Sequence, residues 1–277
     1  MSDVSRELSA AIVRLREARV ESPQLDAQLL MTHALGCSRP SVISHPERVL
    51  SDDQLAAFGL MLEKRASRYP LAYILQKKEF FGLALDVSPA VLIPRPETEI
   101  LVEQVLARVG TRARIADIGT GSGAISVALA VNLHEARVWA TDTSDDALKV
   151  AAANAEKHAV ADRVTIVSGD LLEPLIRMGL EFDAVVSNPP YIPSMVIESL
   201  ELEVRCEPAG ALDGGADGLD AYRRLLPQAV ECTRLVVVEF GIGQGDCVID
   251  ISKAAGFTAV EIIRDLAGIE RVAVARR

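Results

Sequence analysis

The sequence predicts an α/β protein with a small N-terminal all-helical domain, and three observations support this. From Arg114 onward, apolar strand-like runs alternate with amphipathic helical stretches, which is typical of an open, mainly parallel sheet. Before residue 75, apolar side chains recur at helical spacing. The length of 277 residues suits a main domain of about 200 residues and a smaller one. We therefore expect a helical bundle at 1–75, a β-hairpin linker at 76–93 and the α/β domain at 94–277.

The composition excludes several classes of protein. With 49% hydrophobic and 25% charged residues, the chain should fold as a soluble globular protein. The cysteines show neither CxxC nor metal-site spacing, so we expect reduced thiols, no metal and a cytoplasmic location. No apolar run reaches the roughly 18–20 residues of a membrane span, and the N-terminus lacks the pattern of a signal sequence.

The net charge of −10 is unevenly distributed along the chain. Residues 1–75 contain nine basic and nine acidic residues, so the excess of acidic residues lies in the rest of the chain. An acidic catalytic part without a basic stripe disfavours binding to nucleic acid. We expect a protein partner and no direct contact with nucleic acid or membrane.

Residues 1–75 predict an amphipathic bundle. Helices are expected at 4–19, from Pro23 to Gly36, and from Ser51 to Pro70, with a proline at a first helical position and a capping box among the signals. This region contains no glycine loop, metal cluster or carboxylate pair. We expect it to hold a partner, and a purely structural role is the alternative.

The segment between the bundle and the α/β domain has two features. Residues 71–91 shift toward a strand period, with a glycine between two short runs, which predicts the hairpin linker. Residues 92–99 then read LIPRPETE, in which two prolines bracket Arg95 just before a helix that starts at Glu97. Such a rigid loop suits the presentation of Arg95 to a substrate, and an ordinary helix start is the alternative.

The α/β domain begins with the first strand. Strands are expected at 114–118, 136–141, 163–167, 182–187, 234–240, 257–263 and 271–275. Helices are expected at 123–133, 145–157, 219–232 and 245–255.

The first of these strands leads into a glycine loop and then a helix. The loop consists of small residues, namely Gly119, Thr120, Gly121, Ser122 and Gly123. Glycines let the backbone turn sharply and approach a ligand closely. Taken alone, the loop also suits a dinucleotide site or an ordinary turn.

Residues at the ends of the neighbouring strands narrow the choice of ligand. Asp142 and the pair Asp170-Leu171 follow the next two strands, so they should lie at the same edge of the sheet as the glycine loop. Asp142 can accept hydrogen bonds from ribose hydroxyls, and Asp170-Leu171 can face adenine. Asp117, just before the loop, disfavours a pyrophosphate anion and favours a cation. The sulfonium of S-adenosylmethionine meets that requirement.

The strand at 182–187 ends in the tetrapeptide Asn188-Pro189-Pro190-Tyr191. The prolines supply no N–H, so the strand cannot continue in the ladder. The Asn188 side-chain oxygen and the Pro189 carbonyl can accept both hydrogens of a planar NH2 group, while the Tyr191 ring covers its face. A plain exit from strand to loop is the alternative.

Four segments together resemble the HemK-type release factor glutamine methyltransferases over nearly the whole chain. They are LIPRPETE at 92–99, DIGTGSG at 117–123, SNPPYIP at 187–193 and EPAGALDGGADGLDAYRRLL at 207–226. The resemblance implies a Rossmann-like class I S-adenosylmethionine methyltransferase domain and a helical substrate-recognition bundle. It implies methyl transfer to the side-chain amide nitrogen (N5) of the glutamine in the Gly-Gly-Gln motif of peptide chain release factors. The chain departs from the family pattern at Gln76, Cys206 and 231–234.

Residue roles also follow from the resemblance. Gly119 to Gly123, Asp142, Leu171 and Asn188 would contact S-adenosylmethionine. Asn188 to Tyr191 would hold the glutamine. The chemistry of the tetrapeptide makes Asn188, Pro189 and Tyr191 the expected catalytic residues, and the rigid loop with two prolines places Arg95 beside the substrate. An N6-adenine nucleic-acid methyltransferase or a ribosomal-protein glutamine methyltransferase would use the same tetrapeptide, and a cofactor-binding module without catalysis is a further alternative.

Overall fold

A computed structural model describes residues 2–277 and divides into two compact units. The helical unit holds the chain up to Gln76 together with Glu201–Cys206, and the sheet unit holds Lys77–Leu200 and Glu207–Arg277. The predicted linker therefore groups largely with the sheet unit, because Phe80 and Leu85 of the hairpin are buried in its core.

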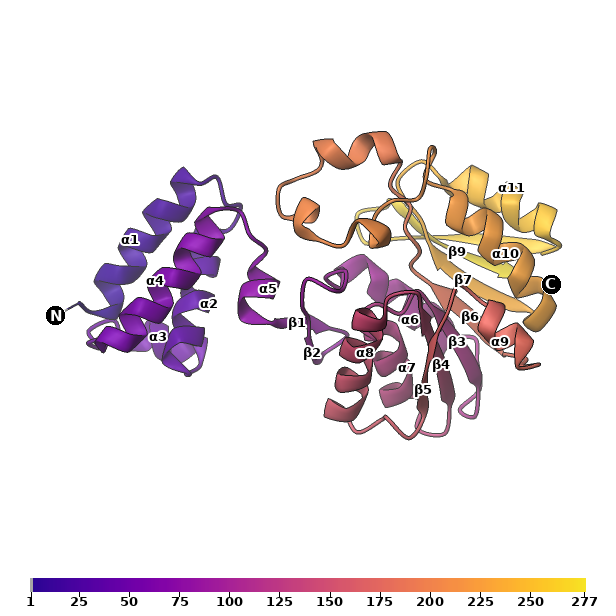
Figure 1. The fold of residues 1–277 in the computed structure, drawn as a ribbon, viewed down its shortest axis with the longest axis horizontal. Coiled ribbons are helices and arrows are strands. Elements are labelled where there is room, and N and C mark those ends of the chain that lie inside the picture. Colours follow the sequence, from indigo (N-terminus) through magenta and orange to yellow (C-terminus); the bar gives the residue numbers. More distant parts are fainter. Residues whose placement is uncertain (1) are drawn as a thin grey trace. The chain divides into compact units, whose positions relative to one another are not determined.

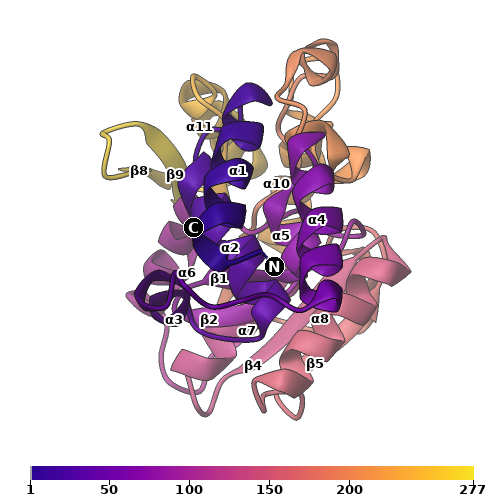
Figure 2. The same cartoon turned by 90° about the vertical axis from the view of Figure 1, so that its left-hand side faces the viewer.

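The helical unit consists of short and long helices around one core. They are α1 (Val4–Glu17), α2 (Pro23–Leu35), α3 (Arg39–Ser44), α4 (Asp52–Ala66) and α5 (Leu71–Leu75). Figures 1 and 2 show α1, α2 and α4 lying side by side. Ser51 caps α4 and Gln54 returns the bond to the Ser51 backbone, as the capping-box spacing predicts. Leu15, Leu30 and Phe58 fill the core.

Residues 71–75 lie in the predicted bundle, although their apolar pattern gave a conflicting indication. The alternating apolar pattern indicated a shift toward strand here, but the segment forms α5. Pro70 stands at its N-cap, where a missing N–H costs nothing, and Gln76 ends it in the left-handed region with φ of 57°. This conformation favours glycine, and Gln76 is one of the positions at which the chain departs from the family pattern.

The short segment Glu201–Cys206 joins the helical unit through buried charges. Arg65 Nε donates to Asp26 Oδ2 at 2.7 Å, and Arg65 Nη1 donates to Glu203 Oε1 at 3.0 Å. Arg68 donates to the same Glu203 oxygen. The side chains of Arg65 and Asp26 are each 8% exposed, so the ion pair is well shielded from water.

The sheet unit contains a small hairpin and one large sheet. The hairpin pairs β1 (Lys77–Phe80) with β2 (Leu83–Asp86). The large sheet has the order β5-β4-β3-β6-β7-β9-β8 and is parallel except for β9, which runs antiparallel to both neighbours. Its strands are β3 (Arg114–Ile118), β4 (Arg137–Asp142), β5 (Val164–Ser168), β6 (Ala184–Ser187), β7 (Leu235–Glu239), β8 (Ala259–Arg264) and β9 (Glu270–Arg276).

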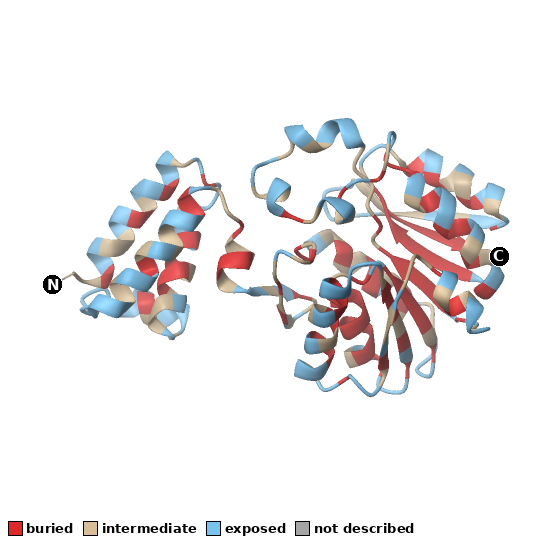
Figure 3. Cartoon of the chain, viewed as in Figure 1, coloured by how far each residue is buried: buried red, intermediate tan, exposed pale blue. Residues whose placement is uncertain are grey.

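Helices cover both faces of this sheet (Figure 1). One face carries α6 (Glu99–Leu106), α7 (Ala124–Asn132) and α8 (Asp145–Lys157). The other carries α9 (Glu173–Arg177), α10 (Asp220–Cys232) and α11 (Gly245–Ala255). Strands β6 and β7 are buried at every position, as Figure 3 shows, which accounts for their continuous apolar runs in the sequence.

The strand order reverses direction between β3 and β6. From β3 the chain moves outward through β4 to β5, then crosses back to form β6 and β7 on the other side. Loops that leave β3 and β6 therefore diverge and open a crevice at the carboxyl ends of the strands. This topology determines where the ligand site lies.

Candidate functional site

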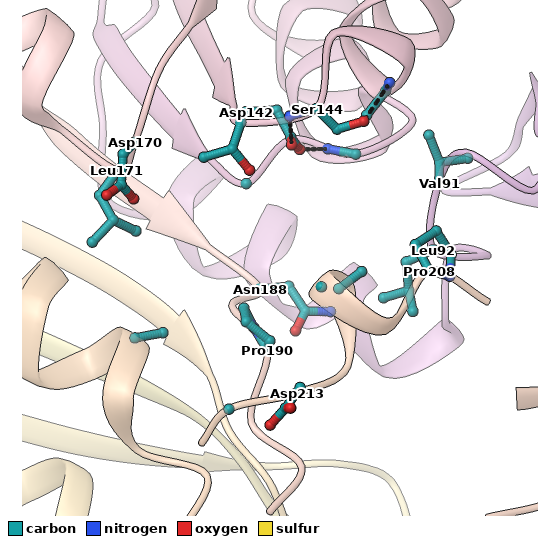
Figure 4. A pocket seen from close by; sticks show the side chains of 18 of the residues that line it. Val91, Leu92, Asp142, Ser144, Asp170, Leu171, Asn188, Pro190, Pro208 and Asp213 are labelled. Carbon is teal, nitrogen blue, oxygen red and sulfur yellow. Dashed lines mark hydrogen bonds between the residues drawn. The ribbon is translucent and has the colours of Figure 1, made fainter. Parts of the chain in front are cut away.

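A cleft of about 750 Å³ occupies the crevice at the carboxyl ends of β3 to β6 (Figure 4). The loops after these strands line it, together with residues 90–92 and residues of the segment from Pro208 to Arg224. Several residues that the sequence singles out line this cleft, namely Gly119, Gly121, Asp142, Asp170, Leu171, Asn188 and Pro190. The structure thus brings the three predicted motifs to one place.

The glycine loop after β3 serves two purposes. Gly119 and Gly121 have φ of 69° and 54°, and a Cβ atom built on either meets nothing within 4 Å. They leave open space where a ligand can approach the backbone. Gly123 has φ of 77°, and a Cβ there would lie 3.0 Å from the Ala151 backbone, so this glycine lets α7 pack against α8. Thr120 and Ser122 are buried behind the loop.

Asp117 lies fully buried beneath the glycine loop. Its Oδ2 atom accepts hydrogen bonds from Thr120 Oγ1 at 2.7 Å, from Ser126 Oγ at 2.6 Å and from Ser126 N at 3.1 Å. Its Oδ1 atom has no hydrogen-bond partner within residues 2–277. Burial raises the pKa of Asp117 to about 6, although the hydrogen bonds lower it. A carboxylate with a free acceptor below the loop suits a positively charged ligand.

Asp142 ends β4 with its carboxylate held by the backbone. Oδ2 accepts from Gly121 N at 2.9 Å and Oδ1 accepts from Ser144 N at 2.9 Å (Figure 4). An ionised carboxylate has about four acceptor positions, so each oxygen keeps capacity for a ribose hydroxyl. The arrangement holds the group in one orientation while leaving it able to bind.

Leu171 turns the chain after β5 with φ of 50°, an unusual value for a non-glycine residue. Its carbonyl accepts a hydrogen bond from Thr141 Oγ1 at 3.1 Å, which fixes the turn at the cleft. The neighbouring Asp170 forms an ion pair with Arg224 of α10. Leu171 therefore offers an apolar surface at the end of the cleft where the sequence places adenine.

The charge of the cleft favours a cation. Among the described residues that line it, Asp142, Asp170, Asp213 and Asp220 are acidic and Arg224 is basic. The positive sulfonium of S-adenosylmethionine fits this field, and the open backbone of Gly119 and Gly121 fits a closely approaching ligand. Within residues 2–277 no group of three or more His, Cys, Asp or Glu side chains is placed to hold a metal ion.

The tetrapeptide after β6 places its members differently. Asn188 and Pro190 face the cleft across from Asp142 (Figure 4), whereas Pro189 is buried. Tyr191 lies outside the cleft lining, and its hydroxyl donates to Glu239 Oε1 at 3.1 Å. Burial raises the pKa of Tyr191 well above its ordinary value, so the phenol stays protonated. The hydroxyl is thus tied to Glu239, and the position of the ring over a substrate stays a prediction.

Arg95 makes a contact that the sequence did not indicate. It forms an ion pair with the buried Glu207, whose second oxygen accepts a hydrogen bond from Ile93 N at 2.9 Å. Arg95 therefore joins the LIPRPETE segment to the start of the 207–226 segment and does not line the cleft.

Sequence reasoning missed two residues next to Asn188. Thr98 Oγ1 accepts a hydrogen bond from Asn188 Nδ2 at 3.0 Å and donates one to Glu239 Oε2 at 2.7 Å. Thr98 lies within the LIPRPETE segment, and Glu239 is a carboxylate that ends an otherwise apolar strand. A charge at the end of a fully buried strand was the available signal.

Comparison with known proteins finds two matching family models and relatives over nearly the whole chain. The PrmC N-terminal domain matches residues 8–75, and the methyltransferase small domain matches residues 96–200. A release factor glutamine methyltransferase of Moorella thermoacetica is 45% identical, with 98% of this chain and 97% of that protein covered. Those of Geobacter sulfurreducens and Caulobacter vibrioides are 44% and 40% identical, with 93% and 95% of this chain and 91% and 93% of theirs covered.

Solved structures share the fold over most of this chain. The catalytic domain of hMettl16 in complex with the MAT2A 3′UTR hairpin 6 has a TM-score of 0.60 at 20% identity, over 78% of this chain and 81% of that chain. A methyltransferase from Pyrococcus furiosus has a TM-score of 0.52 at 18% identity, over 71% and 89%. From the full-length relatives, the chain is an S-adenosylmethionine-dependent enzyme of the release factor glutamine methyltransferase family.

Proposed function

We propose that this enzyme methylates the N5 side-chain amide nitrogen of the glutamine in the Gly-Gly-Gln motif of peptide chain release factors, in the cytoplasm. The observation that carries the proposal is the position of Asn188, which faces the cleft opposite Asp142 with its amide held in one orientation. The names of the full-length relatives support the same substrate.

The cofactor, when bound, supplies an electrophilic methyl group on its sulfonium. Gly119 and Gly121 would let the ligand approach the backbone, and Asp142 would accept its ribose hydroxyls. Leu171 would pack against adenine. Asp117, with its free oxygen beneath the loop, contributes negative charge close to this ligand.

The substrate amide is a weak nucleophile because its lone pair is delocalised into the carbonyl. The Asn188 side-chain oxygen and the Pro189 carbonyl would accept its two N–H bonds, which localises the pair and orients it toward the methyl group. Alignment of this kind supplies up to roughly 7–11 kcal/mol of barrier reduction. The methylated amide is acidic enough to lose its proton to water. Tyr191 would hold the tetrapeptide through the bond from its hydroxyl to Glu239, and its ring would cover the face of the amide.

The helical unit would recognise the release factor. The residues that line the cleft all belong to the sheet unit. A pocket built around Asn188 and Pro190 accepts many exposed glutamines, so selectivity requires contacts elsewhere on the substrate. The helical unit, with its balanced charge, suits a protein surface.

A mass measurement tests the proposal. Incubation with a purified release factor and S-adenosylmethionine should add a single methyl group to the Gly-Gly-Gln glutamine, located by peptide fragmentation. A release factor with asparagine in place of that glutamine is the control and should remain unmodified. Adenine-containing RNA serves as the competing substrate, and methylation of RNA alone would overturn the proposal.

The role of Asn188 is tested with Asn188→Ala. Loss of one preorganised polar group should lower kcat on the order of 10²–10³-fold, while binding of S-adenosylmethionine stays nearly unchanged. Calorimetry and turnover on the same preparation separate the two effects. A variant that retains more than half of the wild-type rate would rule out this role.

A further inference from the structure

Next to Asn188, hydrogen bonds connect four side chains from three parts of the sheet unit. Asn188 Nδ2 donates to Thr98 Oγ1 at 3.0 Å, and Thr98 Oγ1 donates to Glu239 Oε2 at 2.7 Å. Tyr191 donates its hydroxyl to the other oxygen of Glu239 at 3.1 Å. Thr98 lies at the start of α6 and Glu239 at the end of β7, and both are buried.

The chemistry of these groups determines the direction of each bond. An ionised carboxylate only accepts, so each oxygen of Glu239 accepts a hydrogen bond from a hydroxyl. Thr98 has one hydroxyl proton, and it points to Glu239. The remaining capacity of Thr98 Oγ1 toward Asn188 is that of an acceptor, and the part of the Asn188 amide that can donate is Nδ2.

Because Nδ2 of the Asn188 amide faces Thr98, the amide oxygen Oδ1 faces away from Thr98. Asn188 Oδ1 accepts no hydrogen bond from any residue that the structure describes, and Asn188 lines the cleft. We propose that Thr98 and Glu239 are positioning residues that fix the orientation of the Asn188 amide, so that an acceptor and not a donor faces the substrate NH2 group. This inference rests on the proposed role of Asn188 as that acceptor.

The chain of hydrogen bonds from Asn188 through Thr98 to Glu239, called the relay below, is held by further contacts of Glu239. Both oxygens of Glu239 are engaged, and its backbone carbonyl accepts a hydrogen bond from the buried Tyr222 hydroxyl at 2.7 Å. Rotation of the Glu239 side chain would break two bonds in a buried site, and an unpaired buried polar group is costly. The amide of Asn188 is therefore held more firmly than a single hydrogen bond would hold it.

The same arrangement predicts a pH dependence. Burial raises the pKa of Glu239 most strongly, and the hydrogen bonds from Thr98 and Tyr191 lower it. Of the nearby charged residues, Glu97 raises this pKa and Arg271 lowers it. A protonated Glu239 can donate to Thr98, whose own proton is then free to reach Asn188. The amide would turn over and present Nδ2 to the substrate, so activity should fall as the pH drops through the pKa of Glu239.

Three variants of the full-length enzyme test the relay. Thr98→Val keeps the shape but accepts no hydrogen bond, and we expect its kcat/KM for the release factor to fall on the order of tenfold, the effect of one lost hydrogen bond. Thr98→Ser keeps the hydroxyl and should restore most of the rate. Glu239→Gln keeps the shape but replaces one of the two accepting oxygens with an NH2 group, so the bond from Thr98 or the bond from Tyr191 must reverse, and we expect kcat/KM to fall.

Two further readouts separate positioning from a structural role. The affinity for S-adenosylmethionine, measured by calorimetry, should be unchanged in Thr98→Val, and the acid limb of the pH profile should disappear in Glu239→Gln. The side-chain amide proton signals of Asn188, assigned in NMR spectra by their loss in Asn188→Ala, should shift in Thr98→Val and return in Thr98→Ser. This measurement needs no substrate.

The results that would overturn the inference are distinct from those that would overturn the proposed function. If Asn188→Ala loses activity but Thr98→Val turns over at the wild-type rate, the relay has no role and the function stands. Equal losses in Thr98→Ser and Thr98→Val would also exclude the hydroxyl as the cause. If the wild-type enzyme leaves the release factor unmodified, the function fails, and the NMR comparison still decides whether Thr98 orients Asn188.

Discussion

Single residues in the cleft combine fixed orientation with unused binding capacity. Asp142 is held by two backbone N–H groups, and each of its oxygens still has a free acceptor position. Gly119 and Gly121 contribute open space, since their backbone borders a part of the cleft that a side chain at either position would occupy. A preorganised site of this kind needs little rearrangement when its ligand binds.

Replacement of Asp142 tests the ribose contact. We expect Asp142→Ala to weaken S-adenosylmethionine binding by roughly 1.5–3 kcal/mol, the size of hydrogen bonds to a charged acceptor. Calorimetric titration measures the effect, and Asp142→Asn, which keeps one acceptor, should lie between the variant and the wild type. Unchanged affinity in Asp142→Ala would show that the carboxylate does not contact the ribose.

Asp117 predicts a pH dependence of cofactor affinity. The pKa of this carboxyl is raised to about 6 by burial, so it gains a proton below that pH. A bound sulfonium stabilises the ionised form and lowers this pKa, so binding releases a proton at acid pH. Affinity should therefore rise with pH up to about 6, by at most about tenfold per pH unit, and level off above.

The uncharged sulfur of S-adenosylhomocysteine supplies the control for this pH dependence. Its affinity should change less over the same pH range, and Asp117→Asn should flatten the curve for S-adenosylmethionine. Calorimetry between pH 5 and 8, about one to two units either side of the pKa, covers the transition. Parallel curves for the two ligands would contradict the assignment of the effect to Asp117 and the sulfonium.

At the scale of elements, burial and connectivity account for where the motifs meet. Parallel strands β3 to β6 end at one edge, so residues from distant parts of the chain face one cleft. The helical unit depends on a different kind of contact, in which Arg65 on α4 pairs with Asp26 on α2 and with Glu203 from the inserted segment.

Loss of Arg65 should destabilise the helical unit. Arg65→Ala leaves Asp26 and Glu203 buried without their shared partner, and breaking a buried pair costs about 3–5 kcal/mol of unfolding free energy. Denaturant unfolding followed by far-UV circular dichroism measures this change. The sole tryptophan, Trp139, lies in β4, so its fluorescence reports the sheet unit separately.

A matched control for Arg65 is Arg14, which pairs with Glu63 on the surface at 3.0 Å. Arg14→Ala should leave the unfolding transition nearly unchanged, because exposed ion pairs contribute little. Similar unfolding curves for Arg65→Ala and Arg14→Ala would contradict the importance of the buried cluster.

At the scale of the whole molecule, chemistry and recognition should be separable. The cleft is lined by residues of the sheet unit, so a chain that lacks residues 1–76 should bind S-adenosylmethionine with normal affinity. Its kcat/KM for an intact release factor should fall at least on the order of tenfold more than its kcat/KM for a short Gly-Gly-Gln peptide, equivalent to about 1.4 kcal/mol of lost contacts.

Two controls accompany the truncation. Cofactor titration shows whether the shortened chain is folded, which matters because Glu201–Cys206 loses its packing partner. Equal losses on the intact substrate and the peptide would mean that the helical unit stabilises the enzyme without recognising the release factor.

No helix within residues 2–277 is long and apolar enough to cross a membrane.

The sequence by itself determined the α/β class, the strands to within about two residues and the glycine turn after β3, because these depend on local patterns. It also placed Asp142, Leu171 and Asn188 at one site, since the carboxyl ends of parallel strands must meet at one edge. For residues 71–75 the sequence indicated both the helical bundle and a shift toward strand, because a short apolar run is compatible with both, and the segment is helical.

Only the tertiary structure decided which polar groups become partners. Thr98 meets Glu239 across 141 residues of sequence, and Arg95 meets Glu207 across 112. Glu203 likewise reaches Arg65 over 138 residues and takes its segment into the helical unit. Hydrogen bonds and ion pairs between distant residues have no local periodicity. They form because the buried surfaces of strands and helices bring particular side chains together. In the sequence, they are indicated only by a single charged residue in an otherwise apolar strand.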